Sequence, residues 1–381
     1  MIKGKSRRLQ FVVDDLSGVE LKRVLLNRQI MSVFLKSGNK TIADLCQITN
    51  SSIPTVNSSL SFLLKQGWVL NYGTTESRGG RKPAMYGINP KAGYTISIDL
   101  SRNYTSFAVY NLHSVLIDEV CSMPIGIDSK EIVLDRIKES LNNLLIKLSL
   151  SRELILGVGI ALPGLIDINS GVSYSYDLFN GEPVYRVFET LLELPCFIEH
   201  DTRAMALGEK WFGIAGDINN ALLINVGTGI GLSMILNGEL YRGKSGFAGE
   251  FGHINIVSDG QRCYCGKIGC LETVASGSYI ANRANSIIGS KQVLDNPLTF
   301  SNVIERAVGG DIICIEILEE ASEYLAKGLS SVIHIFNPDA VIIGGEMSKG
   351  GEFIKSILDY KLSKYTINLM KNDTSILVSK L

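Results

Sequence analysis

Apolar positions in the first ninety residues recur first with the spacing of helices and then with the spacing of strands. Helical patterns cover residues 21–38, 40–49 and 50–67, and glycines end the first and the third. Residues 68–73 and 84–89 are typical of two strands joined as a hairpin. Three helices followed by a hairpin is the element order of a winged helix-turn-helix, a domain that binds DNA. A small helical domain that binds another protein is the alternative.

The third helical pattern has one apolar and one polar face. The residues expected to face the core are Ile53, Val56, Leu60, Leu63 and Leu64. Those expected on the opposite face are small and polar: Thr55, Asn57, Ser58, Ser59 and Ser61. Ser52 can cap this helix, as Thr41 and Asp44 can cap the preceding one. Because a recognition helix presents its N-terminal residues to base edges, the predicted DNA contacts are Ser52, Thr55, Asn57 and Ser58.

From about residue 93 the pattern becomes a mixture of strands and helices. Strand patterns cover residues 94–100, 105–112, 115–125 and 154–162, and a long amphipathic helix covers 129–150. Residues 219–240 are typical of a strand, a glycine turn, a second strand and an Asn-Gly hairpin turn. A helix over 316–336 then leads to a strand that ends in a glycine pair. These patterns predict an α/β body.

Charge is distributed unevenly along the chain. Residues 1–90 hold 13 of the 37 Lys and Arg residues but 5 of the 38 Asp and Glu residues. A basic first quarter favours a nucleic-acid-binding module, although a solvated basic surface is the alternative. Between the two hairpin strands, Arg78, Arg81 and Lys82 flank glycines and could reach phosphates or a minor groove. No signal peptide or bilayer-spanning stretch is evident, so we expect a cytoplasmic protein without a membrane partner.

Three of the seven cysteines lie within eight residues. Cys263, Cys265 and Cys270 are separated by a single turn, which Gly266 and Gly269 allow to be tight. Such a spacing favours Zn²⁺, and His253 can supply the fourth ligand. Four protein ligands leave no open position for water, so the predicted role of the zinc is structural. A cluster of buried thiols without metal is the alternative.

The whole chain from about residue 20 resembles the ROK family (repressor, open reading frame, kinase). The resemblance is carried by "FAGEFGHINI", "CYCGKIGCLETVASG", "EHDTRAMALGE", "LPGLID", "NVGTGIG" and "NPDAVIIGG" in the family's order. It implies a winged helix-turn-helix at 18–90, then an actin-like, ribonuclease-H-like body with lobes at 91–212 and 213–381 and a sugar cleft between them. It also points to His253 as a zinc ligand.

The resemblance further implies a set of sugar ligands. Both Glu250 and Glu272 match glutamates that contact sugar hydroxyls, and His253 could reach the sugar from its other ring nitrogen. Asp201 matches the general base of the family's kinases. The remaining candidates are His200, Gly164 and, by a loose match, Asp177.

The family contains kinases and repressors, and two departures favour the repressors. His200 stands where the kinases usually have asparagine before the catalytic aspartate. In the first phosphate loop Asp99 remains, but Ser101 and Arg102 replace two glycines, which obstructs close backbone approach to phosphates. The other residues of a vestigial nucleotide site are Gly227, Thr228, Gly229, Gly344 and Gly345.

These features together predict a regulator rather than an enzyme. The leading hypothesis is a sugar-responsive transcriptional repressor, a homodimer or dimer of dimers, that binds a pseudo-palindromic DNA operator. No catalytic residue is then expected, with Asp201 as the base if the protein is a kinase. The alternatives are an ATP-dependent sugar kinase and a sugar-binding protein whose N-terminal domain binds another protein.

Overall fold

The structure is a computed structural model, which describes residues 17–74, 83–127, 131–290 and 296–381. The chain forms two compact units. The first unit contains residues 1–162 and 176–198, and the second contains residues 163–175 and 199–381. These divisions differ from the predicted domain boundaries, and the three-part division of the sequence stays a prediction. Among the described residues, no helix is long and apolar enough to cross a membrane.

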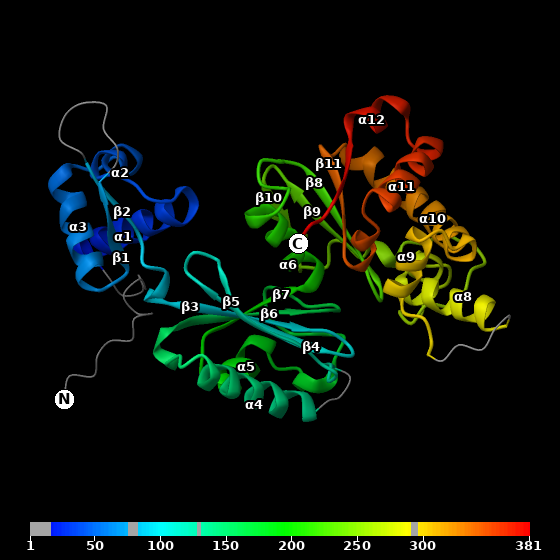
Figure 1. Ribbon diagram of the computed structural model, residues 1–381, viewed down its shortest axis with the longest axis horizontal. Coiled ribbons are helices and arrows are strands. Elements are labelled where there is room, and N and C mark those ends of the chain that lie inside the picture. The colour runs from blue at the N-terminus through cyan, green and yellow to red at the C-terminus, as the bar shows by residue number, and fades with distance from the viewer. Residues whose placement is uncertain (1–16, 75–82, 128–130, 291–295) are drawn as a thin grey trace. The chain divides into compact units, whose positions relative to one another are not determined.

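The first unit begins with the predicted three helices and hairpin (Figure 1). Their bounds are α1 Gly18–Ser37, α2 Ile42–Thr49, α3 Ile53–Lys65, β1 Val69–Thr74 and β2 Ala84–Ile88. The predicted capping box forms at α2, where the Thr41 hydroxyl accepts from the Asp44 N–H and the Asp44 carboxylate accepts from the Thr41 N–H. These hydrogen bonds hold the pKa of Asp44 below its ordinary value. Lys40 and Tyr86 exchange backbone hydrogen bonds of 2.9 Å, which ties the α1–α2 connection to β2.

Three expectations about α3 are wrong: the burial of Ile53, the exposure of Ser59 and the capping by the Ser52 side chain. Ile53 is 60% exposed although it lies on the apolar side of the helical pattern, and Ser59 is buried. Periodicity gives the direction of a side chain around the helix, but Ile53 lies in the first turn, beyond the core formed by Val56, Leu60 and Leu63. Ser52 precedes α3 as predicted, yet its hydroxyl bonds the Thr55 hydroxyl at 2.8 Å and does not cap the backbone.

The rest of the first unit is a five-stranded sheet in the order β5-β4-β3-β6-β7, with helices α4 and α5 along one face (Figure 1). Its elements are β3 Tyr94–Leu100, β4 Thr105–Asn111, β5 Leu116–Met123, α4 Glu131–Lys147, β6 Ile155–Leu162, α5 Val184–Leu192 and β7 Cys196–His200. Strands β3, β4 and β5 are antiparallel neighbours, and β6 runs parallel to β3.

The second unit repeats this strand arrangement in the order β10-β9-β8-β11-β12. Its strands are β8 Ala221–Val226, β9 Ile230–Leu236, β10 Glu239–Tyr241, β11 Ala340–Gly344 and β12 Ser375–Val378. Its helices are α6 Asp201–Phe212, α7 Glu272–Ala275, α8 Gly277–Gly289, α9 Phe300–Val308, α10 Ile312–Phe336, α11 Gly351–Tyr365 and α12 Asn368–Asp373.

Alternate residues of β8 explain how both faces of the second sheet are covered. Leu222 and Ile224 pack into the large core that contains residues of α8, α9, α10 and α11. Ala221 and Leu223 point to the opposite face, in the cluster that contains Ala206 of α6. A strand with period-two alternation that is apolar on both faces is buried on both sides, as in a doubly covered α/β sheet.

Candidate functional site

The cysteine loop of the second unit is closed by short backbone bridges. Arg262 pairs with Ile268, and Asn255 pairs with Cys270, so the loop folds back to the segment that carries His253. Gly269 has a φ of 70°, and a Cβ there would lie 1.8 Å from the Val257 carbonyl oxygen. Only glycine fits this position, and it brings the last cysteine beside the histidine.

The four predicted ligands converge as the sequence indicates. One ligand atom from each of His253, Cys263, Cys265 and Cys270 lies within 4.8 Å of the other three. The Cys265 and Cys270 sulfurs are 3.7 Å apart, and Cys263 Sγ is 3.6 Å from His253 Nδ1. With Zn–S bonds of about 2.3 Å and Zn–N bonds of about 2.0 Å, tetrahedral edges are about 3.8 Å (S to S) and about 3.5 Å (S to N). The group could therefore hold a metal ion such as zinc.

The pKa values of the three thiols are shifted in different directions: at Cys265 burial acts to raise the pKa, but hydrogen bonds from the Lys267 backbone and the neighbouring thiols outweigh it and lower the pKa. Burial and the neighbouring thiols raise the pKa of Cys270 to about 12, and burial likewise raises the pKa of Cys263. A bound divalent cation reverses this preference because the thiolate is the ligand. A metal bound to Cys263 and Cys270 would displace their protons, so its binding would weaken as the pH falls.

The second ring nitrogen of His253 faces two other groups. Its Nε2 lies 3.2 Å from the hydroxyl oxygen of Tyr264 and 3.9 Å from a carboxylate oxygen of Glu250. The His253 and Tyr264 rings meet edge to face, with centroids 5.3 Å apart. Tyr264 was not predicted as a site residue, although its position between two cysteines could have indicated it.

Glu272 begins α7 and contacts the glycine turn between β8 and β9. Its carboxylate accepts the N–H of Ile230 at 3.1 Å. A Cβ on Gly229 would lie 2.7 Å from the same carboxylate, and a Cβ on Gly252 would lie 3.2 Å from it. Glycine at both positions lets Glu272 lie against the turn and against the segment between Glu250 and His253.

The start of α6 contacts the strands before and after the same turn through Thr202, the neighbour of the predicted residue Asp201. Asp201 accepts hydrogen bonds from the N–H and the hydroxyl of Thr202, and it lies 3.2 Å from His200 Nδ1. The Thr202 hydroxyl also accepts from the Asn225 side chain at 3.3 Å. A Cβ on Gly231 would lie 2.3 Å from that hydroxyl, so the start of β9 packs directly on α6.

A buried ion network lies beside Asp201, and sequence reasoning did not find it. Glu199 bonds Arg203 at 2.6 Å and Arg242 at 2.9 Å, and Arg203 also donates to the Gly246 carbonyl at 2.6 Å. Burial alone would raise the pKa of Glu199, but the two guanidinium groups outweigh it and hold that pKa below its ordinary value. Arg203 is only 2% exposed, so this pair fixes the start of α6.

The remaining predicted residues lie elsewhere in the two units. Gly164 has a φ of 89° in the second unit, while Asp99 and Asp177 belong to the first. Gly344 pairs with Asn225, and a Cβ on Gly345 would lie 2.3 Å from the Asn225 side chain, so this glycine pair meets the end of β8. The described α3 residues Ser52, Thr55, Asn57 and Ser58 are exposed. Arg78, Arg81 and Lys82 lie outside the described residues.

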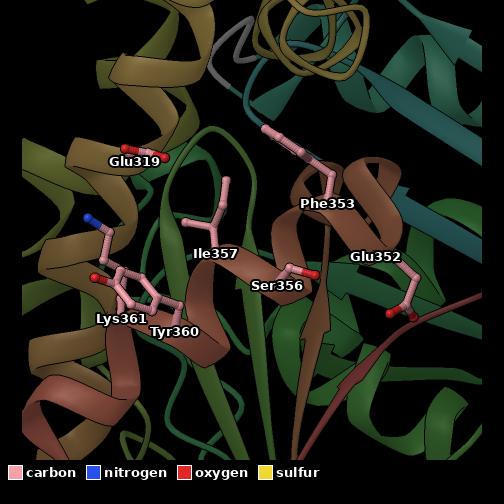
Figure 2. Close-up of a pocket in the computed structure, with 7 residues that line it drawn as sticks. All are labelled: Glu319, Glu352, Phe353, Ser356, Ile357, Tyr360 and Lys361. Carbon is pink, nitrogen blue, oxygen red and sulfur yellow. The ribbon is translucent and has the colours of Figure 1, made fainter.

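A groove of about 510 Å³ runs along α10 and α11 (Figure 2). It is lined by Glu319, Glu352, Phe353, Ser356, Ile357, Tyr360 and Lys361. None of these is a predicted site residue.

Comparison with known proteins identifies the family. The model of the ROK family matches residues 95–381, which is most of the chain. The chain belongs to the ROK family. A xylose repressor of Bacillus spizizenii is 29% identical over 369 residues, covering 96% of this chain and 94% of that protein. The ROK-family regulator NagC of Escherichia coli, a DNA-binding transcriptional dual regulator, is 27% identical and covers 89% of this chain and 84% of its own.

Solved ROK structures share the fold. A ROK family transcriptional regulator, a homologue of the E. coli MLC protein, has a TM-score of 0.77 at 24% identity and covers 95% of this chain and 92% of its own. A ROK glucokinase from Streptomyces griseus, in complex with glucose and AMPPNP, has a TM-score of 0.65 at 25% identity and covers 76% of this chain and 95% of its own. The predicted fold class, a winged helix-turn-helix followed by an actin-like body, is confirmed.

Proposed function

We propose that this ROK protein is a sugar-responsive transcriptional repressor. The observation that carries the proposal is that the resemblance to named repressors extends over nearly the whole chain, including the three helices and the hairpin. The exposed N-terminal part of α3 presents Thr55, Asn57 and Ser58, which can hydrogen-bond to base edges in a major groove. A homodimer would present two such helices to a two-fold symmetric operator.

The sugar would be bound beside the metal group of the second unit. Glu250, His253 and Glu272 belong to or flank the loop that carries the cysteines. Asp201 bonds Thr202, whose hydroxyl contacts Asn225 at the end of β8, next to the glycine turn that Glu272 contacts. Carboxylates accept hydrogen bonds from adjacent hydroxyls, which suits sugar recognition. The structural zinc would fix the positions of the ligands and perform no reaction. His200, Gly164 and Asp177 stay further predicted ligands.

The turn between β3 and β4 supports a regulator rather than a kinase. The Ser101 N–H donates to the Tyr104 carbonyl at 2.9 Å, which directs this amide into the turn. None of residues 101–104 has a positive φ, so the turn has an ordinary conformation in which side chains replace the family's glycines. Phosphoryl transfer depends on positioning the phosphates, and residues 101–104 contain no glycine that would let the backbone approach them closely.

The deciding experiment is a DNA-shift titration on the region upstream of the gene, repeated with a panel of sugars that includes D-xylose, N-acetyl-D-glucosamine and D-glucose. We expect specific binding whose affinity falls steeply with salt and changes with one sugar of the panel. A coupled phosphorylation assay on the same sugars tests the kinase alternative. Robust ATP-dependent turnover would overturn the proposal, and salt-independent or absent DNA binding would favour a protein partner instead.

The basic hairpin tip gives a separate prediction. Arg81→Ala should weaken operator binding about fivefold to tenfold, because a phosphate contact is lost, and should reduce its salt dependence by about one charge. Sugar affinity should not change. Lys91→Ala, a basic residue outside the hairpin, is the control. Unaltered DNA affinity in the Arg81 variant would remove the hairpin tip from the interface.

A further inference from the structure

Tyr264 lies between two of the metal-ligating cysteines, and its hydroxyl contacts the histidine of the same group. The hydroxyl oxygen is 3.2 Å from His253 Nε2. Metal on Cys263 and Cys265 would hold the Tyr264 backbone on both sides, while the side chain itself is 64% exposed. Because tyrosine has only two side-chain torsions, its hydroxyl is held near His253 at little cost in entropy.

The direction of this hydrogen bond follows from the metal group. His253 Nδ1 lies 3.6 Å from Cys263 Sγ, so this nitrogen faces the other ligands. A nitrogen that binds metal uses its lone pair, which leaves the ring proton on Nε2. With metal on Nδ1, Nε2 would donate and the Tyr264 hydroxyl would accept. The nearest Glu250 oxygen, at 3.9 Å, is too far for a direct hydrogen bond.

The same N–H is well placed for a ligand hydroxyl. A hydroxyl group both donates and accepts, so one placed near His253 and Glu250 could accept from the ring and donate to the carboxylate. We propose that Tyr264 is an internal competitor of the effector, whose hydroxyl holds the His253 N–H until a sugar hydroxyl replaces it. This inference rests on the proposed sugar site.

This competition would set the affinity for the sugar, and so the sugar concentration at which the protein responds. A sugar that binds His253 exchanges one hydrogen bond for another, so this contact adds little net affinity while Tyr264 is present. Moving the tyrosine opens no buried core because the residue is 64% exposed, and what it gives up besides the hydrogen bond is its edge-to-face contact with the His253 ring. Removing only the hydroxyl should therefore tighten sugar binding by about threefold to tenfold, the effect of one net hydrogen bond.

The test is Tyr264→Phe in the full zinc-loaded chain, titrated calorimetrically with D-xylose, N-acetyl-D-glucosamine and D-glucose. Tyr360→Phe is the matched control, since Tyr360 is 65% exposed and lies on α11, outside the site. We expect one zinc per chain in the unsubstituted protein and in both variants. Sugar binding should be tighter only in the Tyr264 variant. Weaker binding would make Tyr264 a direct sugar ligand, and unchanged binding would make it a bystander; either result overturns the proposal.

A measurement without sugar separates this inference from the proposed function. The chain has four histidines, so the ring nitrogens of His253 can be resolved by ¹⁵N NMR. In the zinc-loaded, sugar-free protein, Tyr264→Phe should shift the Nε2 resonance of His253, whereas Tyr360→Phe should not. An unmoved resonance would refute the Tyr264 hydrogen bond even if sugar binds. A shifted resonance with no sugar binding in either protein would reject the effector site while keeping the hydrogen bond.

Discussion

Each unit has its own five-stranded sheet with a hairpin at the corresponding position, and the turns of the two hairpins make different contacts. In the first unit β3 and β4 are joined by residues 101–104, and in the second β8 and β9 are joined by residues 227–229. Each hairpin starts from the strand at the centre of its five-stranded sheet. The first turn has no glycine and is closed by a hydrogen bond from the Ser101 N–H to the Tyr104 carbonyl. The second has glycine at both ends and touches Glu272.

The two turns differ in the neighbouring segments that pack against them. At the first turn, the close approach is made by Gly126, where a Cβ would lie 2.0 Å from the Arg102 carbonyl oxygen. At the second turn, Gly277 donates to the Gly227 carbonyl at 2.8 Å and Glu272 lies against Gly229. Neither Gly227 nor Gly229 has a positive φ. Gly229 is therefore needed for space, because a Cβ there would lie 2.7 Å from the Glu272 carboxylate, whereas a Cβ on Gly227 would meet only the Asn225 side chain, at 3.9 Å.

The largest expected effect comes from removing the metal that would hold this loop. Cys265→Ser should abolish zinc binding and, because Glu272 and Glu250 lie on the same loop, weaken sugar binding at least tenfold. Metal content by atomic emission and sugar affinity by calorimetry test this. Cys46→Ser, in the N-terminal helices, is the control and should change neither. Intact sugar affinity in a metal-free Cys265 variant would refute the supporting role of the zinc.

The next effect concerns α6, on which the second hairpin packs. Glu199→Gln leaves Arg203 buried without its anionic partner and should lower the free energy of unfolding by about 3 kcal/mol at neutral pH. The depressed pKa of Glu199 means that its contribution is present above the ordinary value of 4.5 and is lost as the pH falls below it. Urea unfolding at several pH values should therefore show the two proteins converging in acid. A constant difference down to pH 3 would contradict the pairing.

A comparison of the two turns places alanine in each of them. Gly229→Ala forces the Glu272 carboxylate to move and should destabilise the protein by about 1–3 kcal/mol, as overpacking does. Ser101→Ala, in the first turn, removes only a hydroxyl that donates to the Asp99 carboxylate at 3.4 Å and should change the free energy of unfolding by less than about 0.5 kcal/mol. Urea unfolding of both variants decides. Equal effects would mean that the second turn carries no special packing constraint.

The smallest expected effect is on phosphoryl transfer. Restoring the family's glycines in the double variant Ser101→Gly and Arg102→Gly should produce no measurable ATP-dependent turnover, since two glycines do not rebuild a phosphate site. The variant should lose only about 0.5–1 kcal/mol of stability per glycine from added chain entropy. The coupled assay on the sugar panel measures the first and urea unfolding the second. Measurable turnover would show that the residues of the first turn alone prevent this chain from acting as a kinase.

Much of the fold followed from local patterns. The capping pair Thr41 and Asp44, the Asn-Gly turn at 237 and 238, and the strand over 221–226 all form where the sequence predicts them. The exposed position of Ile53 did not follow, because periodicity cannot say how far neighbouring helices extend. The Glu199 pair with Arg203 was equally hidden, although its members are four residues apart, because burial rather than spacing makes it matter.

By itself, the sequence determined the elements, the basic first quarter, the family and the four residues of the metal group, because these depend on residue type and spacing along the chain. Tertiary structure decided which nitrogen of His253 faces the sulfurs and which group meets the other one. It also decided that Glu272 rests on a turn more than forty residues away. Contacts of this kind arise from packing in three dimensions, where a few tenths of an ångström separate a hydrogen bond from a collision.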